Sequence, residues 1–366
     1  MVRKSLVGQT VGHYIIEELI ATGGMSQVYR ARDPELDRTV AIKIIGIDTV
    51  REPVFAERLN REARTIAQLR HPNIVGIYHK GAHDDLAYLV IEYVNGPTLS
   101  AILKAVHDRG AQLDYRAMLT IVGSVCSALD YAHSLGVIHR DIKPSNIMAD
   151  RNGMVYLTDF GLALRMVDGT EGKAFGSPYY IAPEQINSSA DASPRSDIYA
   201  LGVVTFRMLT GTLPFMAKKP MQVVMKHLSE PPPPPSTLNP ALSPAVDKVI
   251  VRALAKNPQD RYWHASDFHK ALANALGLPD MSGPTYQPTF LATTWTTIGD
   301  NEADDSGTFA SATHLLEDMS PPSRPITQPT PSPTEPTTSP AEMNDLTDAT
   351  PFMRPKPAAD DEASSP

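Results

Sequence analysis

The hydrophobic pattern of this chain changes once, near residue 96, and that change constrains the fold more than any other feature of the sequence. Before it, β-branched and aromatic runs separated by Gly, Asp and Pro predict strands over residues 13–21, 26–33, 38–45, 73–82 and 86–94. One segment among them, residues 54–70, has apolar residues at helical spacing. The first part of the chain is therefore expected to be strand-rich with one helix.

After Gly96 and Pro97 the apolar residues recur with a helical period. Helices are predicted over residues 99–110, 115–136, 196–211, 220–230, 244–257 and 264–277, and a short strand-like patch over 153–161. Five prolines at 231–235 predict a stiff connector between helices, with an SH3 ligand as the alternative. The pattern predicts an α+β, bilobal domain over residues 13–276, with a strand-rich lobe at about 13–94, a helical lobe at about 97–276 and a hinge near 92–96.

The composition changes again at about residue 277. Residues 277–366 are rich in Pro, Thr, Ser and Asp and hold few large apolar side chains, so they cannot bury enough surface to offset the entropy of ordering. Residues 281–366 contain 13 acidic and 3 basic residues, whereas residues 1–280 contain 28 acidic and 30 basic residues. We expect a disordered, acidic tail after a nearly neutral globular domain.

The sequence also argues against several classes of protein. The nearly neutral domain has no basic footprint of the kind that nucleic-acid binding requires. The one cysteine, Cys126, lies in an apolar helical run and is expected to be a buried packing residue, which suits a reducing cytoplasm. The N-terminus has no apolar signal-peptide region, and no stretch approaches the roughly 18 apolar residues of a membrane span. We therefore expect a cytoplasmic protein with no nucleic-acid partner and no membrane span.

Residues 139–146, His-Arg-Asp-Ile-Lys-Pro-Ser-Asn, gather charged and polar side chains directly after an apolar helix. One interpretation is a solvated turn ended by its proline, and the other is a loop that transfers a phosphoryl group. In the second, Asp141 accepts or orients the proton of an attacking hydroxyl, and Lys143 neutralises charge that develops on the phosphoryl group. Asn146 offers an oxygen suited to Mg²⁺, and Asp159, after the strand-like patch, offers a second one.

Three features of the strand-rich part are compatible with the same chemistry. The glycine-containing turn at residues 20–33 permits a tight hairpin whose N–H groups face phosphates, with an ordinary β-turn as the alternative. Lys43 ends the next strand, where it could reach the same phosphates or remain a solvated lysine. Glu62, in the helical segment, could pair with Lys43 or, on the helix surface, with Arg58. Each feature alone is ambiguous.

The order of these motifs is far more specific than any one of them. Along the chain come a glycine-containing turn, VAIK at 40–43, a helix glutamate, HRD with its later Asn, DFG at 159–161 and APE at 182–184. Over roughly residues 13–275 this order resembles the eukaryotic-like serine/threonine protein kinases of bacteria. The resemblance implies a kinase fold and a signalling enzyme that uses ATP and Mg²⁺ to phosphorylate proteins, itself included.

The resemblance also implies roles for individual residues. Asp141 and Lys143 are expected to be catalytic, and Asn146 and Asp159 are expected to bind Mg²⁺. Glu62 is expected to pair with Lys43. The residues expected to form the ATP site are Ala21, Gly23, Gly24, Ser26, Val28, Ala41, Lys43, Glu62, Glu92 and Val94.

Three further residues would have structural roles in such a kinase: Glu184 paired with Arg261, and Asp197 bracing the HRD loop from behind.

The glycine turn departs from the family pattern G-x-G-x-x-G-x-V, because Ala21 and Ser26 replace two of its glycines. Both side chains are small, so the loop keeps its fold if Ala21 avoids the backbone region that only glycine adopts. The replacement of two glycines in this turn is expected to affect the affinity for ATP rather than the fold.

Specificity and regulation are indicated by residues near the catalytic loop. Lys143, two residues after Asp141, and Ser177, in the segment before APE, indicate transfer to Ser and Thr rather than Tyr. Arg140 beside the catalytic Asp indicates control by phosphorylation of the activation segment between DFG and APE, where Thr170 is the best-placed acceptor.

Residues 281–366 hold 24 Ser and Thr. They form either a spacer or an autophosphorylated segment that recruits a phosphothreonine-binding, forkhead-associated domain. Members of the family can form homodimers through the small lobe, and no feature of this sequence decides that point. The competing function is a pseudokinase scaffold that recruits partners without catalysis. The presence of Lys43, Asp141, Asn146 and Asp159 argues against it.

Overall fold

The computed structural model of the chain describes residues 5–23, 26–46, 66–83, 86–160 and 178–279. Outside these residues lie Gly24, Glu62, Thr170, Ser177, most of the predicted helix at 54–70, and the tail from residue 280 onward. The roles expected of them therefore stay predictions.

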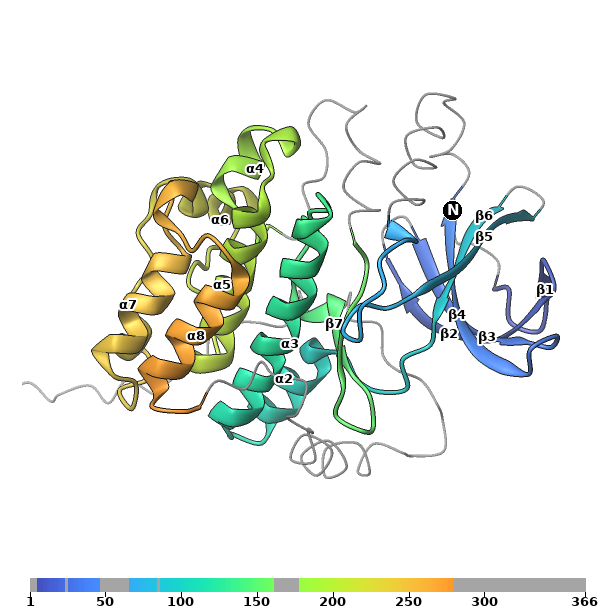
Figure 1. Cartoon of the computed structure of the whole chain (residues 1–366), viewed down its shortest axis with the longest axis horizontal. Helices are drawn as coiled ribbons and strands as arrows, with labels where there is room; N and C mark the ends of the chain where they lie inside the picture. Colours follow the sequence, from blue (N-terminus) through green and yellow to red (C-terminus); the bar gives the residue numbers. More distant parts are fainter. Residues whose placement is uncertain (1–4, 24–25, 47–65, 84–85, 161–177, 280–366) are drawn as a thin grey trace, which may run out of the picture. The chain divides into compact units, whose positions relative to one another are not determined.

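Six antiparallel strands form the sheet of the N-terminal lobe, in the order β1-β2-β3-β4-β6-β5 (Figure 1). They are β1 (Thr10–Val11), β2 (Tyr14–Thr22), β3 (Ser26–Asp33), β4 (Arg38–Gly46), β5 (Ile77–His83) and β6 (Leu86–Glu92). All five predicted strands of this lobe are confirmed. β1 has only two residues and is too short to produce a pattern in the sequence.

Both faces of the central strand β4 are buried. Val40, Ile42 and Ile44 pack on one face in a small core with tyrosines of the neighbouring strands. Because side chains alternate along a strand, Lys43 points to the opposite face, where it is only 8% exposed. It lies across from Leu89 of β6. The pleat of β4 thus directs one buried cation away from the small core.

Helices build the C-terminal lobe (Figure 1). They are α2 (Leu99–Asp108), α3 (Tyr115–Ser134), α4 (Pro183–Asn187), α5 (Pro194–Thr210), α6 (Pro220–Ser229), α7 (Pro244–Ala253) and α8 (Ala265–Leu276), with 3₁₀ turns η2 (Pro144–Asn146), η4 (Ser189–Asp191), η5 (Pro235–Thr237) and η6 (Pro258–Asp260). Asp114 caps the N-terminus of α3, and Gly211 ends α5 in a left-handed conformation. The six predicted helices of this lobe are confirmed, and with them the α+β, bilobal fold.

Two strand predictions are too long. The patch at 153–161 reduces to β8 (Val155–Leu157), which pairs with β7 (Ile147–Ala149) in a ladder of three residues. Residues 73–76 do not join the large sheet, because Ile74 forms a single parallel bridge with Leu157 instead. Asp159 consequently lies beyond the end of a strand rather than inside one.

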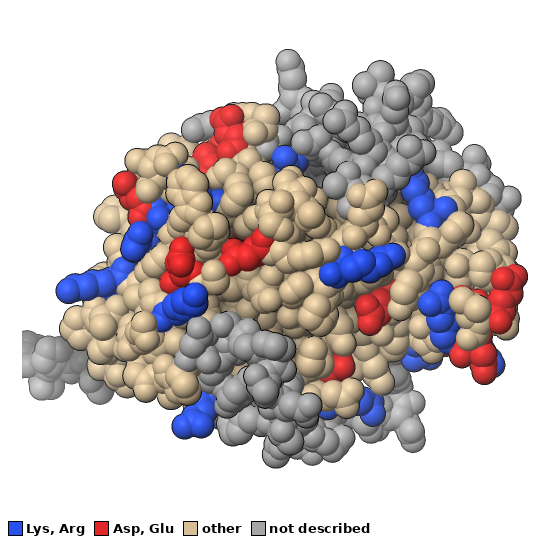
Figure 2. Space-filling model, in the orientation of Figure 1, with Lys and Arg blue, Asp and Glu red and all other residues tan. Residues whose placement is uncertain are grey.

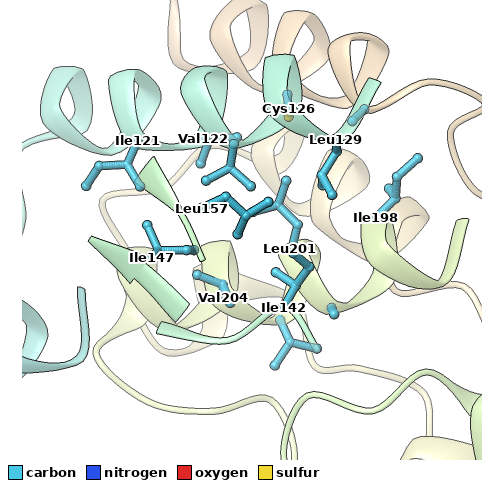
Figure 3. Close-up of a cluster of buried hydrophobic side chains, with 14 of the residues drawn as sticks. Ile121, Val122, Cys126, Leu129, Ile142, Ile147, Leu157, Ile198, Leu201 and Val204 are labelled. Carbon is cyan, nitrogen blue, oxygen red and sulfur yellow. The ribbon is translucent and has the colours of Figure 1, made fainter. Parts of the chain in front are cut away.

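The segment between α3 and β8 is anchored in the larger core. Ile142 and Ile147 are each 1% exposed and belong to the same cluster as Leu157 and the inner faces of α3 and α5 (Figure 3). Ile142 stands between Asp141 and Lys143 in the sequence. Since a closely packed core resists displacement, it fixes the backbone that carries both of these charged residues.

On the surface face in Figure 2, acidic and basic side chains lie interspersed, so neither sign of charge gathers in one place there. Among the described helices, none is long and apolar enough to cross a membrane.

His227 of α6 is fully buried in the C-terminal lobe. Its Nδ1 lies 2.8 Å from the hydroxyl oxygen of Tyr199, and the ring of Phe215 packs edge-on against it. Burial and, after it, the positive charge of Lys256 lower the pKa of His227 to about 3. The folded protein therefore keeps this imidazole neutral at pH values where the unfolded chain protonates it.

We expect the protein to lose stability as the pH falls from about 6.5 toward about 3, because in this window the unfolded chain binds a proton at His227 that the folded protein does not bind. This site contributes a slope of up to about 1.4 kcal/mol per pH unit to the free energy of unfolding. Urea unfolding at about pH 6.5 and about pH 5 measures the slope. His227→Gln keeps a partner for Tyr199 but does not titrate, so it should flatten the slope. Equal slopes in the parent and the variant would contradict the assignment.

Candidate active site

Lys43 of β4 and Asp159, beyond β8, form an ion pair that joins the two lobes. Lys43 Nζ lies 2.7 Å from Asp159 Oδ1, although 116 positions separate the two residues in the sequence. The Lys43 side chain is 10% exposed and that of Asp159 is 33% exposed. The structure thus brings together a predicted ATP-binding residue and a predicted metal ligand.

The backbone and charge of Asp159 are both unusual. Its φ of 61° lies in the left-handed region, which is uncommon for a residue with a side chain. Burial by itself would raise the pKa of Asp159, but the charge and hydrogen bond of Lys43 outweigh it and hold the pKa below the ordinary value. Asp159 is therefore a carboxylate at neutral pH, as a metal ligand must be.

Asp141, Lys143 and Asn146 form a second cluster on the catalytic loop. Lys143 Nζ lies 2.7 Å from Asp141 Oδ2, and Asn146 Nδ2 donates to the same oxygen at 3.0 Å and to the Asp141 carbonyl at 2.8 Å. Among the described residues, both side-chain contacts of the Asp141 carboxylate fall on Oδ2. Its Oδ1 is consequently the oxygen left for an incoming hydroxyl.

The donor set fits a divalent metal such as Mg²⁺. The Asn146 side chain turns its nitrogen toward Asp141, and its oxygen Oδ1, which accepts one long hydrogen bond from Ser145 Oγ at 3.5 Å, keeps a lone pair for a cation. Asp159 adds carboxylate oxygens, of which Lys43 engages Oδ1. Hard cations of this size prefer oxygen ligands and need few from the protein, because phosphates and water complete their shell.

Asp197 of α5 braces the loop from behind, as the sequence predicts. Its carboxylate accepts hydrogen bonds from the backbone N–H groups of His139 at 2.9 Å and Arg140 at 2.7 Å. It also lies 2.8 Å from His133 Nε2. Although burial acts to raise it, the pKa of Asp197 is held below its ordinary value by the hydrogen bond and charge of His133. The brace thus carries a negative charge at neutral pH.

His139 links the loop to the end of β8. Its Nδ1 accepts the backbone N–H of Asp141 at 3.2 Å, so its Nε2 carries the proton and donates to the Thr158 carbonyl at 2.8 Å. Burial lowers the pKa of His139, although Asp197 acts in the opposite direction. The ring is therefore neutral and holds the two loops of the site in register.

The predicted ATP-binding residues of the N-terminal lobe lie on neighbouring strands. Ala21 of β2 pairs with Val28 of β3, so Ala21 has ordinary strand geometry and needs no glycine conformation. The Gly23 N–H donates to the Ser26 carbonyl at 2.8 Å and closes the hairpin. Ala41 lies across the ladder from residue 91 on β6. Substitution of the family glycine at position 21 is thus compatible with the hairpin.

In the segment that connects the two lobes, some backbone and side-chain polar groups of Glu92 and Val94 already form hydrogen bonds within the protein. The Glu92 N–H donates to the Gly76 carbonyl at 2.9 Å, and the Glu92 carboxylate accepts the Gly76 N–H at 3.3 Å. The Val94 carbonyl accepts the N–H of Gly96 at 3.1 Å. Among the described residues, the Val94 N–H makes no hydrogen bond outside the ladder, so it is a backbone group that could serve an adenine.

Sequence reasoning assigns no role to His133, His139 or Gln185, all of which contact the catalytic loop or its brace. Gln185 carries a local signal, because Gln at the third position of a helix that begins with Pro183 is typical of a helix cap. The contacts of His133 with Asp197 and of His139 with Thr158 carry none, because they join residues 64 and 19 positions apart.

Comparisons with known proteins agree with this geometry. A family model described as the protein kinase domain matches residues 14–272. Serine/threonine-protein kinase PrkC of Bacillus subtilis is 39% identical over 74% of this chain, and PknA of Mycobacterium tuberculosis is 42% identical over 73%. The matches cover 42% of PrkC and 62% of PknA, so this chain spans less than two thirds of either relative. The crystal structure of the M. tuberculosis PknI kinase domain superimposes with a TM-score of 0.60 at 29% identity, covering 75% of this chain and all of that domain.

Proposed function

The chain belongs to the family of eukaryotic-like serine/threonine protein kinases of bacteria, and on that basis we propose that it transfers the γ-phosphate of ATP to Ser and Thr hydroxyls of proteins. Kinases of this family use ATP and a divalent metal ion. The observation that carries the proposal is the convergence of Asp141, Lys143, Asn146, Lys43 and Asp159 in one site, with the ion pair and hydrogen bonds described above.

The chemistry divides among the residues by charge. When bound, Mg²⁺-ATP supplies the phosphoryl group and part of the positive charge that offsets its negative oxygens. Asp141 holds the substrate hydroxyl through Oδ1 and accepts its proton, while Asn146 and Lys143 fix Oδ2. The Lys143 ammonium also offsets charge that develops on the transferred group.

The remaining predicted residues bind and orient ATP. Lys43 holds the α- and β-phosphates, and Glu62 is its proposed partner. Asn146 and Asp159 hold Mg²⁺ through side-chain oxygens, which supports magnesium over softer metals. The hairpin and hinge residues Ala21, Gly23, Gly24, Ser26, Val28, Ala41, Glu92 and Val94 enclose the phosphates and the adenine.

Several finer features belong to the same proposal. The catalytic domain comprises residues 13–276, and residues 277–366 form a disordered tail whose phosphothreonines recruit a forkhead-associated domain. Phosphorylation of Thr170 increases activity by pairing with Arg140. The protein acts in the cytoplasm on other proteins and on itself, and a homodimer through the small lobe rests on the family resemblance alone. Support for these features comes from the sequence and its resemblance to the family.

Incubation with labelled ATP and Mg²⁺ tests the function. We expect label on the protein itself and on a generic substrate such as casein, and none when EDTA removes the metal. Mass spectrometry should then find phosphate on Thr170 and on tail threonines. Binding of ATP, seen as a thermal shift, without transfer in Mg²⁺ or Mn²⁺ would instead support the pseudokinase scaffold.

A further inference from the structure

Gln185 of α4 connects the end of the activation segment to the loop that carries Asp141. Its Nε2 donates to the carbonyl oxygen of Arg140 at 3.1 Å, and its Oε1 accepts the backbone N–H of Ala182 at 3.2 Å. Gln185 is only 6% exposed. Both ends of a buried amide are therefore engaged, one within its own helix and one on the catalytic loop.

The carbonyl held by Gln185 belongs to the peptide group that joins Arg140 to Asp141. Arg140 has a φ of 69°, an unfavourable conformation for a residue with a side chain, which persists only where the surroundings impose it. The N–H of the same peptide group donates to His139 Nδ1 at 3.2 Å. Gln185 and His139 thus hold opposite edges of this group, and its rotation would move Asp141.

α4 presents Gln185 from a fixed position. The preceding residue, Glu184, forms two hydrogen bonds with the Arg261 guanidinium, at 2.7 and 2.8 Å, and accepts a third from Ser196 Oγ at 2.7 Å. A helix of five residues would otherwise be only weakly held. Because Glu184 is anchored, the Gln185 side chain can act as a rigid support.

A simpler explanation is that Gln185 only caps α4. Its bond to the Ala182 N–H is half of a capping box, in which a Gln or Glu at the third helical position reaches back to the N-cap residue. Capping requires only an acceptor at this position. Gln185 also donates a hydrogen bond to the Arg140 carbonyl, which lies outside the helix, on the catalytic loop. Capping does not account for this second bond.

We propose that Gln185 is a positioning residue for phosphoryl transfer, which holds the Arg140–Asp141 peptide group so that the Asp141 carboxylate keeps its orientation toward the substrate hydroxyl. This inference rests on the proposed kinase function. It assigns to Gln185 an effect on the rate of transfer and not on the binding of ATP or of the protein substrate.

Gln185→Glu, assayed at a pH where the carboxyl is ionised, separates the two explanations, because the carboxylate keeps the acceptor for Ala182 and has no donor for Arg140. We expect kcat to fall about ten- to a hundredfold, the range for a catalytic group displaced by a fraction of an ångström to about 1 Å. The KM values for ATP and casein should stay within about twofold of the parent, since neither binding surface is altered.

Asn239 provides a matched control. Its Nδ2 donates to the Leu209 carbonyl at 2.9 Å, its Oδ1 accepts the Ala241 N–H at 3.2 Å, and it is 5% exposed. Asn239→Asp therefore makes the same chemical change in an equally buried amide, but away from the catalytic loop. We expect a comparable drop in the melting temperature with the kcat of the parent.

Three results would contradict the inference. Full kcat in Gln185→Glu makes Gln185 a cap only, and an equal kcat loss in Asn239→Asp attributes the effect to general destabilisation. A raised KM for casein at unchanged kcat assigns Gln185 to substrate binding. If Gln185→Glu does not fold, Gln185→Met, which has no donor, must show the loss in kcat instead. Absence of transfer by the parent protein overturns the proposed function, and this inference with it.

Discussion

Replacing Asp141 by Asn is expected to lower kcat by at least about a thousandfold, within the range that a general base contributes. The amide cannot accept the proton of the substrate hydroxyl. It can still accept hydrogen bonds from Lys143 and Asn146 through its own oxygen, so the loop keeps its support. Because Asp141 contacts the hydroxyl and not ATP, the affinity for ATP should change little. Steady-state kinetics and an ATP-binding titration measure the two quantities.

Asp108→Asn is the matched control for this change. Asp108 forms an exposed ion pair with Lys104 on α2, distant in sequence from the catalytic loop, and its loss should leave kcat unaltered. The Asp141 variant should also unfold at nearly the parent temperature. Activity within about tenfold of the parent would remove Asp141 from the role of base and leave orientation by other groups as the explanation.

Most of the fold was open to prediction because its signals are local. The apolar residues of β4 and α2 repeat along the chain with the period of the element, so each element can be predicted without knowledge of its neighbours. β1, β7 and α4 have only two, three and five residues, which is too few for a repeating apolar pattern to show. The bridge from Ile74 to Leu157 shortens a predicted strand for a reason that only tertiary structure supplies.

The chemical groups of the site could be predicted, but not how they meet. Ordered motifs identify Lys43, Asp141 and Asp159, yet the Lys43–Asp159 contact spans 116 positions and has no local trace. Positive φ at Arg140 and Asp159 opposes the intrinsic preference of both residues, so local sequence argues against it. Such conformations are imposed by partners such as Asp197, and they can be found only once the partners are in place.

Replacing Arg261 by Met is expected to destabilise the fold by about 3–5 kcal/mol, the cost of leaving one partner of a buried ion pair uncompensated. All five N–H donors of the guanidinium are used: two on the Glu184 carboxylate and three on the carbonyls of Arg195, Ala255 and Lys256. The Arg261 side chain is fully buried and that of Glu184 is 12% exposed. Urea unfolding at neutral pH measures the loss.

The pH dependence of this loss identifies its cause. In the parent, burial acts to raise the pKa of Glu184, but the hydrogen bonds and charge of Arg261 lower it below the ordinary value. Glu184 therefore stabilises the parent above its unfolded pKa of about 4.3, and this stability is lost as the pH falls through the lower folded pKa. Without Arg261, burial is the largest remaining influence on the pKa of Glu184 and is opposed mainly by the hydrogen bond from Ser196. The folded pKa should therefore rise above the unfolded one, and the variant should gain stability as the pH falls. The gap between the two proteins should narrow as the pH falls from about 7 to about 5.

Two further variants test whether loss of the Glu184–Arg261 ion pair is the specific cause of the lost stability. Arg32→Met removes an arginine from an exposed pair with Asp37 and should leave the unfolding midpoint near that of the parent. Arg261→Met combined with Glu184→Leu removes the buried charge together with its partner and should recover part of the lost stability. Since Glu184 also anchors the helix that presents Gln185, the double variant should regain stability without regaining kcat. Recovery of both would mean that α4 holds its position without the ion pair, and that the pair contributes to stability alone.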